Sequence, residues 1–271
     1  METTDLISKV RSFEGHQYVY RHKSSSNHCM MTFGVYVPLH SEGDKLPALL
    51  YLSGLTCTHA NVMEKGGVQQ WASKYKMIFI HPDTSPRGEG GASFYVNATQ
   101  KPWNEHFQMK SYIENELVSV VGSLVPSLDE RRIGITGHSM GGHGAITLGL
   151  SRPDVFKSIS AFAPISHPTN CEWGKLALST YLGQNEEEWK KMDGSLMIQS
   201  YIGPKRHILF TQGTDDKFYI EGQLQPESLK STDNVLIEGG LKEGFDHSYY
   251  FVSTFMEEHF VHHSNILAVI H

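Results

Sequence analysis

The sequence predicts a three-layer α/β fold, in which helices cover both faces of a mostly parallel sheet within a single domain spanning residues 1–271. Three observations lead to this prediction. Short apolar runs typical of strands recur along the chain, segments with helical spacing lie between them, and glycine and proline mark the connections. Strands that alternate with helices favour parallel pairing, because a helical crossover returns the chain to the same edge of the sheet.

The expected strands begin with an antiparallel edge, since no helix separates the first two apolar runs. Several later runs are continuously apolar, which is the pattern of strands covered on both faces. In chain order the expected strands are Tyr18–Tyr20, Met31–Val37, Ala48–Leu52, Met77–Ile80, Ile133–Thr136, Ile159–Phe162, Ile208–Thr211 and Val235–Ile237.

The expected helices fill intervals between the later strands and close the chain. In the second of them apolar residues recur near i, i+4, i+7 and i+8, so one face can be buried. The four segments are Val62–Tyr75, Met109–Leu124, a stretch that starts at Gly141 and ends before Pro153, and Tyr249–His263.

The composition argues against two classes of partner. The 271 residues include 39% hydrophobic and 19% charged residues, and the formal net charge is −6 without any basic run. Nucleic acid is therefore not an expected partner, because binding phosphates requires a basic surface. No segment is long and apolar enough for a signal peptide or a membrane span, so no membrane partner is expected.

The cysteines indicate a reducing compartment. Cys29, Cys57 and Cys171 include no C-x-x-C pair and are too few for a disulfide framework. Together with the lack of a recognisable leader, this favours a cytoplasmic protein.

The most informative motif is Gly137-His138-Ser139-Met140-Gly141, which matches G-x-S-x-G. A β-prone stretch runs into it and a helical stretch runs out of it, so the motif lies at a strand-to-helix turn. Such a turn exposes the serine hydroxyl above the sheet and is so crowded that only glycine fits two residues before and after it. The motif therefore predicts a serine hydrolase of the α/β-hydrolase fold with Ser139 as nucleophile. The alternative is a glycine-rich turn that only packs a helix on a strand.

The acid of the triad should follow the serine and precede the histidine in this fold. Asp215 and Asp216 both follow the expected strand Ile208–Thr211, at the carboxyl edge where parallel sheets carry their active sites. Position alone does not separate them, and the aspartate that is not catalytic is expected to cap the loop.

The expected base is His247, one of 16 histidines. It lies between the last expected strand and the last helix, after a loop expected to contain Gly239, Gly240 and Gly244. His138, beside the serine, is expected to point elsewhere on the turn as a packing or hydrogen-bonding residue.

Three further histidines could suggest a metal site. His259, His262 and His263 lie close together in the sequence, but no Asp, Glu or Cys partner has the spacing of a ligand set. A solvated helix end explains them better, so no metal and no cofactor is expected.

The expected chemistry is transfer of an acyl group to Ser139. His247 takes the serine proton, and an aspartate holds the imidazole in the required tautomer. Two backbone N–H groups should bind the oxyanion. One belongs to Met140, directly after the nucleophile, and the other to Leu55, in the loop after the strand Ala48–Leu52.

Together these motifs resemble the S-formylglutathione hydrolase family, also known as esterase D. The resemblance runs from near residue 30 to the last helix, and LSGLTCT, GHSMGGHGA and DHSYYF are together more specific than a general hydrolase signature. The matching blocks are LSGLTCTHAN (Leu52–Asn61), PDTSPRG (Pro82–Gly88), FYVNAT (Phe94–Thr99), GHSMGGHGA (Gly137–Ala145), SAFAPI (Ser160–Ile165), WGK (Trp173–Lys175), QGTDDKF (Gln212–Phe218), GQLQP (Gly222–Pro226) and DHSYYF (Asp246–Phe251).

The resemblance implies a specific acid and a specific substrate. In the family pattern Q-G-x-x-D-x-F, the acid two residues before the phenylalanine serves the triad, which selects Asp216 over Asp215. The family hydrolyses the thioester S-formylglutathione to glutathione and formate, the last step of glutathione-dependent formaldehyde detoxification, and also acts on small acyl esters. Its members are usually cytosolic and commonly form homodimers. The resemblance also implies Ser139, His247, Leu55 and Met140 in the roles given above.

Two positions need separate treatment within the resemblance. Cys57 matches a family cysteine near the active site that makes these enzymes sensitive to thiol reagents, although a small buried hydrophobe is an equal alternative. The connection between Gly88 and Phe94 is only five residues long, where the family carries a longer loop with a W-D-F-G-like segment. A more open site and a broader preference for esters are therefore expected.

Two other classes of function remain open. A carboxylesterase or an acyltransferase would use the same triad on another acyl group, but acyl transfer requires that water is excluded, and the short loop argues against this. A binding protein without activity would keep only the fold, and the presence of all three triad residues argues against it.

Overall fold

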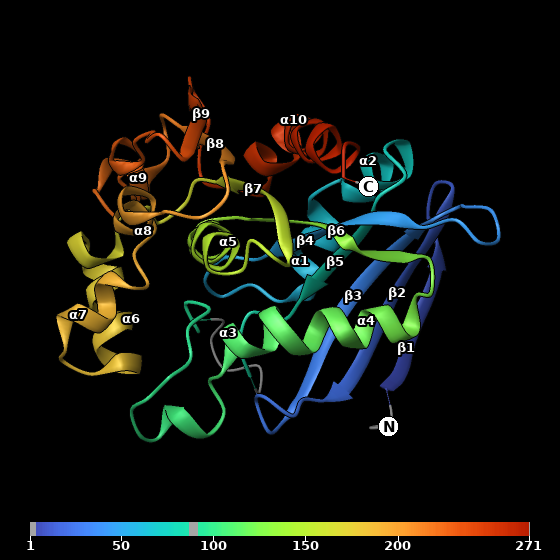
Figure 1. Ribbon diagram of the computed structural model, residues 1–271, viewed down its shortest axis with the longest axis horizontal. Coiled ribbons are helices and arrows are strands. Elements are labelled where there is room, and N and C mark those ends of the chain that lie inside the picture. The colour runs from blue at the N-terminus through green and yellow to red at the C-terminus, as the bar shows by residue number, and fades with distance from the viewer. Residues whose placement is uncertain (1–3, 87–91, 271) are drawn as a thin grey trace.

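A computed structural model of the protein describes residues 4–86 and 92–270. Its centre is one nine-stranded sheet with the order β1-β2-β3-β5-β4-β6-β7-β8-β9 (Figure 1). Strands β1, β2, β3 and β5 pair antiparallel, and all pairs from β5 to β9 are parallel. The predicted fold class is confirmed. The strands are β1 (Thr4–Arg11), β2 (Gly15–Lys23), β3 (Met30–Pro38), β4 (Leu46–Leu52), β5 (Ile78–Pro82), β6 (Leu128–Gly137), β7 (Phe156–Phe162), β8 (Arg206–Gly213) and β9 (Val235–Lys242).

Two strands differ from the prediction. The edge strand β1 was not expected, because its side chains are mostly exposed and form no continuous apolar run. Strand β9 continues through Gly239 and Gly240, which were expected in a loop and instead pair with β8. Gly239 has φ +114°, and a Cβ there would lie 1.8 Å from the carbonyl oxygen of Phe210, so only glycine fits this position.

Helices cover both faces of the sheet. On one face α1 (His59–Lys65), α2 (Val68–Lys74) and α10 (Tyr249–Leu267) contact one another. Figure 1 shows α2 and α10 on the side of the sheet opposite to α4 (Val118–Leu124). Helix α5 (Met140–Ser151) contacts β4, β6 and β7.

The predicted helix Val62–Tyr75 is in fact two helices, α1 and α2. The chain breaks between them at Gly66 and Gly67, where Gly67 has a left-handed φ of +62°. The predicted helix Met109–Leu124 is continuous, but its middle is π-helical. Its parts are α3 (Met109–Ser111), the π-helical η3 (Tyr112–Leu117) and α4.

Four short helices after β7 were not predicted. They gather beside the sheet, at the left of Figure 1. Three of them have seven residues or fewer, too few to show a clear hydrophobic period over several turns. They are α6 (Glu172–Leu182), α7 (Glu186–Lys190), α8 (Gly194–Ser200) and α9 (Lys217–Ile220).

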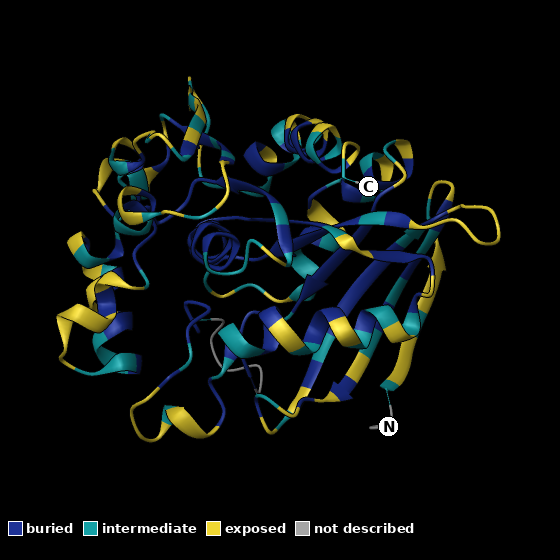
Figure 2. Ribbon diagram, viewed as in Figure 1, coloured by how far each residue is buried: buried dark blue, intermediate teal, exposed yellow. Residues whose placement is uncertain are grey.

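The core lies on both sides of the central strands, as the dark ribbons of Figure 2 show. Strand β5 is buried along its whole length, and so is α5 from Met140 to Leu150. Among the described residues, no helix combines the length and the hydropathy needed to cross a bilayer.

The histidines near the C-terminus are buried, so the prediction of a solvated helix end is wrong. Helix α10 continues to Leu267 and packs against β7, which places these rings on the sheet. His263 hydrogen-bonds to Ser158 Oγ (2.6 Å) and to Ser160 Oγ (2.8 Å). His259 hydrogen-bonds to Ser160 Oγ (2.8 Å) and Thr211 Oγ1 (3.1 Å), and His262 to the carbonyl oxygen of Ile159 (3.0 Å). Across residues 4–86 and 92–270, no group of three or more His, Cys, Asp or Glu side chains is arranged to hold a metal ion.

Candidate active site

Ser139 lies at the turn between β6 and α5. Its backbone has φ 59° and ψ −117°, a conformation that a residue with a side chain rarely adopts. A Cβ on Gly137 would lie 2.3 Å from the carbonyl oxygen of Gly141, and a Cβ on Gly141 would lie 1.9 Å from that of Leu52. Both glycines are therefore required for the chain to turn here.

Hydrogen bonds of the backbone hold this strained turn in place. The N–H of Ser139 donates to Phe162 at the end of β7 (2.9 Å), and its carbonyl accepts from His143 (3.0 Å) and Ile165 (3.3 Å). The residue is 3% exposed, and within the described part of the chain its hydroxyl makes no hydrogen bond. The hydroxyl is therefore free to approach a base and a substrate, and catalytic contacts often tighten only when substrate is bound.

Asp216 is fully buried at the start of α9, after β8. One carboxylate oxygen accepts from the N–H groups of Phe218 (2.9 Å) and Tyr219 (3.3 Å) and caps the helix. The other accepts from Gln212 Nε2 (3.1 Å) and from His247 Nδ1. Asp215 is exposed, and among the described residues its side chain accepts a hydrogen bond only from the hydroxyl of Thr214.

His247 lies in the connection between β9 and α10. A carboxylate can only accept, so the bond to Asp216 requires the proton on Nδ1 and leaves the lone pair on Nε2. The ring packs against His138, with 4.4 Å between ring centroids, and against Phe218 at 4.9 Å. The structure thus pairs His247 with Asp216 and places its ring on the residue that precedes Ser139.

The loop after β4 lies directly against the turn at Ser139. A Cβ on Gly54 would lie 3.2 Å from Ser139 Cβ. The N–H of Cys57 donates to Gly54 (3.2 Å), so residues 54–57 form a tight turn, in which Thr56 has φ +64°. Leu55 lies within this turn. The backbone N–H of Met140 begins α5, where the first N–H groups of a helix have no partner within the helix.

Two residues that the sequence analysis did not select hold this loop. Thr84 donates its hydroxyl to the carbonyl of Cys57, and Asp83 accepts from the N–H (2.9 Å) and the Nδ1 (2.6 Å) of His59. Both follow β5 in the block PDTSPRG, which the family resemblance had already marked as a matching block. Nothing in the local sequence indicates that these two residues contact the loop after β4.

Cys57 is half-buried in the same turn. Burial raises the pKa of its thiol, while the neighbouring Tyr249 side chain acts in the opposite direction. The thiol is therefore mostly protonated at neutral pH, which slows its reaction with electrophiles.

An apolar pocket of about 300 Å³ opens beside the loop. Leu55 lines it together with Phe94, Trp173, Ala177 and Tyr181. The predicted short connection after Gly88 lies mainly outside the described residues, but its end at Ala92 reaches this pocket.

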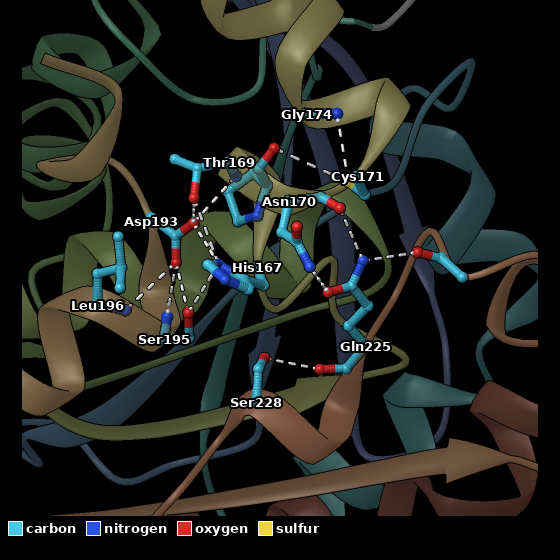
Figure 3. Close-up of polar contacts among 12 residues, drawn as sticks. His167, Thr169, Asn170, Cys171, Gly174, Asp193, Ser195, Leu196, Gln225 and Ser228 are labelled. Carbon is cyan, nitrogen blue, oxygen red and sulfur yellow. Dashed lines mark hydrogen bonds and ion pairs between the residues drawn. The ribbon is translucent and has the colours of Figure 1, made fainter. Parts of the chain in front are cut away.

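A second Ser–His–Asp cluster lies at the start of α8 (Figure 3). Asp193 is buried and accepts from His167 Nδ1 (2.8 Å) and from Ser195 Oγ (2.7 Å). Ser195 Oγ also lies 3.0 Å from the same Nδ1. A triad needs the acid and the serine on opposite ring nitrogens, so this cluster caps α8 and does not activate Ser195.

The chain is similar over most of its length to a known family and to individual proteins. Residues 24–262 match the model of a protein family named Esterase. The S-formylglutathione hydrolase of Rattus norvegicus is 44% identical over 276 residues, covering 96% of this chain and 98% of the relative. That of Paracoccus denitrificans is 43% identical, covering 97% and 98%.

Solved structures have a similar fold. An S-formylglutathione hydrolase from Agrobacterium tumefaciens superposes with a TM-score of 0.91 at 42% identity, covering 97% of this chain and 99% of that one. A ferulic acid esterase, at 16% identity with a TM-score of 0.71 and coverage of 94% and 100%, shares the fold.

Proposed function

The chain belongs to the S-formylglutathione hydrolase family of esterases, and from this premise we propose that it hydrolyses S-formylglutathione to glutathione and formate. The single observation that carries the proposal is the pairing of His247 with buried Asp216 beside the strained turn at Ser139. Relatives that carry this name cover nearly the whole chain, so the scaffold around the site is shared as well.

In the proposed first step, Ser139 Oγ attacks the formyl carbon and His247 Nε2 takes the hydroxyl proton. Asp216 stabilises the imidazolium that forms, while remaining ionised. When the carbon–sulfur bond breaks, the proton passes from His247 to the glutathione sulfur. The formyl group is then an ester on Ser139.

In the second step, water hydrolyses this ester. His247 removes a proton from the water as its oxygen attacks the formyl carbon, and it returns the proton to Ser139 Oγ as formate leaves. In both steps the N–H groups of Leu55 and Met140 are proposed to donate to the oxyanion, which in an enclosed site contributes a large share of the rate.

The pocket beside Leu55 supports a second candidate function, hydrolysis of small acyl esters. A formyl group carries no apolar chain, so about 300 Å³ lined by Phe94, Trp173 and Tyr181 exceeds what this group needs. The pocket could accept the apolar part of an ester instead. This favours a carboxylesterase activity of broad specificity on the same triad.

The experiment that separates the two compares kcat/KM for S-formylglutathione with kcat/KM for a series of p-nitrophenyl esters from acetate to hexanoate. Ser139→Ala serves as the inactive blank and Ser195→Ala as the matched control from the second cluster. A thioester preference of 100-fold or more supports the first function. Esters hydrolysed equally well support the second, and activity that survives in Ser139→Ala contradicts both.

We also propose the cellular setting that the family resemblance implies. The protein would be a cytoplasmic homodimer of single-domain subunits, with no nucleic acid or membrane partner. The three cysteines are free thiols, which is compatible with a reducing compartment. Exposed apolar side chains on the edge strand β1, at Leu6, Ile7 and Val10, offer a surface for a second copy. Light scattering on the purified protein tests the dimer directly.

A further inference from the structure

His138, the residue before the nucleophile, is the most unusual buried group near the site. It is 5% exposed, and neither ring nitrogen has a hydrogen-bond partner among the described residues. Buried polar groups are nearly always partnered, because leaving one without a partner is unfavourable. The fold alone therefore gives no reason for an imidazole at this position.

The contacts of His138 link the base to the loop after β4. Its ring lies 4.4 Å from that of His247 at an interplanar angle of 38°, and 5.8 Å from that of Tyr249 at 63°. On the loop side, a Cβ on Gly54 would lie 3.7 Å from His138 Nδ1. His138 thus fills the space between His247 and the loop that carries Leu55.

Two other contacts restrain the ring of His247. The bond from Nδ1 to Asp216 fixes one atom of the ring, and Phe218 contacts the ring at 90° with 4.9 Å between centroids. A single hydrogen bond allows a ring to swing about the bonded atom. Catalytic groups, however, must be held within about 0.5 Å and 10–20° of the productive geometry.

We infer, on the basis of the proposed function, that His138 is a positioning residue whose flat ring fixes the plane of His247 and so keeps Nε2 aimed at Ser139 Oγ. It acts through His247 and contacts neither the substrate nor the reacting atoms.

The charge state of His138 is compatible with this role. Burial, and to a lesser degree the neighbouring His247, hold the pKa of His138 well below its usual value, so the ring is neutral near pH 7. A neutral ring can pack on His247 in both of its protonation states without repelling the imidazolium. The titratable groups around the pair include Asp216, on Nδ1 of His247, and Tyr249, whose pKa is raised by burial. They also include Asp246, whose pKa is lowered mainly by its hydrogen bonds with Ser248 and in part by His247.

The test compares the intact protein with His138→Ala, which removes the ring, and His138→Phe, which keeps a flat ring without nitrogens. Fluorophosphonate titration counts the reactive sites, so kcat is expressed per competent site. We expect His138→Ala to lower kcat by about tenfold or more with KM changed less than twofold, because alignment and not binding is lost. His138→Phe should recover kcat to within about threefold of the parent.

A spectroscopic signature provides a readout that a purely structural role would not change. The low-field proton resonance of the hydrogen bond between His247 and Asp216 should be sharp in the parent and broadened in His138→Ala at equal folded fraction. If His138→Phe is too crowded to fold, the resonance of His138→Ala still tests the inference.

Three results would overturn the inference. The first is more than half of the parent kcat per site in His138→Ala with an unchanged resonance, whatever its Tm. The second is a well-folded His138→Phe that is as slow as His138→Ala, since the nitrogens and not the ring would then matter. The third is a loss in His138→Ala that appears in KM alone. Activity that persists in Ser139→Ala would instead contradict the proposed function itself, so the two failures are distinguishable.

Discussion

The carboxylate of Asp216 caps helix α9 with one oxygen and accepts the Nδ1–H of His247 with the other. The same buried side chain therefore fixes the start of a helix and the tautomer of the proposed base. Its neighbour Asp215 has neither contact and points to solvent.

This difference predicts unequal effects of two adjacent substitutions. Asp216→Asn keeps a side chain that caps helices well, but its amide can present N–H to His247 and favour the wrong tautomer. We expect kcat to fall on the order of 10⁴-fold, and Asp215→Asn to change it less than about twofold. Steady-state kinetics with p-nitrophenyl acetate measures both, and circular dichroism checks the fold. Similar losses in the two variants would show that Asp216 is not the acid.

From the burial of Cys57 we expect iodoacetamide to inactivate the protein slowly at pH 7 and faster at higher pH. Burial raises the pKa of its thiol, so the reactive thiolate is scarce at pH 7 and increases as the pH rises. A bulky adduct within the turn of residues 54–57 should displace the N–H of Leu55 and lower kcat. Removal of one oxyanion donor typically costs about 10²–10³-fold in kcat.

The matched control for this experiment is Cys57→Ser, which should keep most activity and resist the reagent. If Cys57→Ser is inactivated as fast as the parent, the sensitive thiol is Cys29 or Cys171. If the alkylated parent stays fully active, Cys57 has only a packing role.

Gly141 is predicted to be indispensable for both the fold and the activity. In Gly141→Ala the new Cβ would lie 1.9 Å from the carbonyl oxygen of Leu52, which is backbone and cannot move aside without displacing the end of β4. We expect a loss of about 3 kcal/mol in the free energy of unfolding, since overpacking a rigid site costs this much. Gly43→Ala is the control, because its Cβ would meet nothing within 4 Å and only its φ of +88° opposes the change. Urea denaturation compares the two, and equal losses would refute the steric argument.

The fold was largely predictable from the sequence because the central strands are short, apolar and buried on both faces. Strand β1 was not predictable from the sequence, because its pairing with β2 leaves most of its side chains in solvent. The division of one expected helix into α1 and α2 depends on the left-handed backbone of Gly67. The apolar residues on both sides keep helical spacing, so the sequence pattern does not reveal this break.

The candidate site was predictable where chemistry imposes a local motif. Ser139 between its glycines is such a case, whereas the choice of Asp216 over Asp215 needed the family pattern. The contacts of Asp83 and Thr84 with the loop after β4 join segments that are distant in sequence, so no local pattern encodes them. The burial of His259 was missed because polar partners on the sheet, Ser160 and Thr211, satisfy its ring nitrogens.

The buried histidines predict that the protein loses stability in mild acid. Burial holds the pKa of His262 and His143 at about 4 and that of His81 at about 3, and it lowers the values of His259 and His263 well below 6.5. A folded-state pKa below the unfolded value means that the unfolded chain binds protons first. The stabilisation is therefore complete above about pH 6.5 and is lost as the pH falls from there towards 4, at up to about 1.4 kcal/mol per pH unit for each histidine.

Urea unfolding at pH 7.0, 6.0 and 5.0 measures this loss, and the variant His262→Gln isolates one contributor. Glutamine can still donate to the carbonyl of Ile159 but does not titrate, so the slope of unfolding free energy against pH should fall by about one proton. His28→Asn is the control, because His28 is exposed and asparagine tolerates its positive φ of 51°. If the stability of the parent protein stays constant from pH 7 to pH 5, these rings are protonated equally in the folded and unfolded states. That result would contradict the argument from their burial.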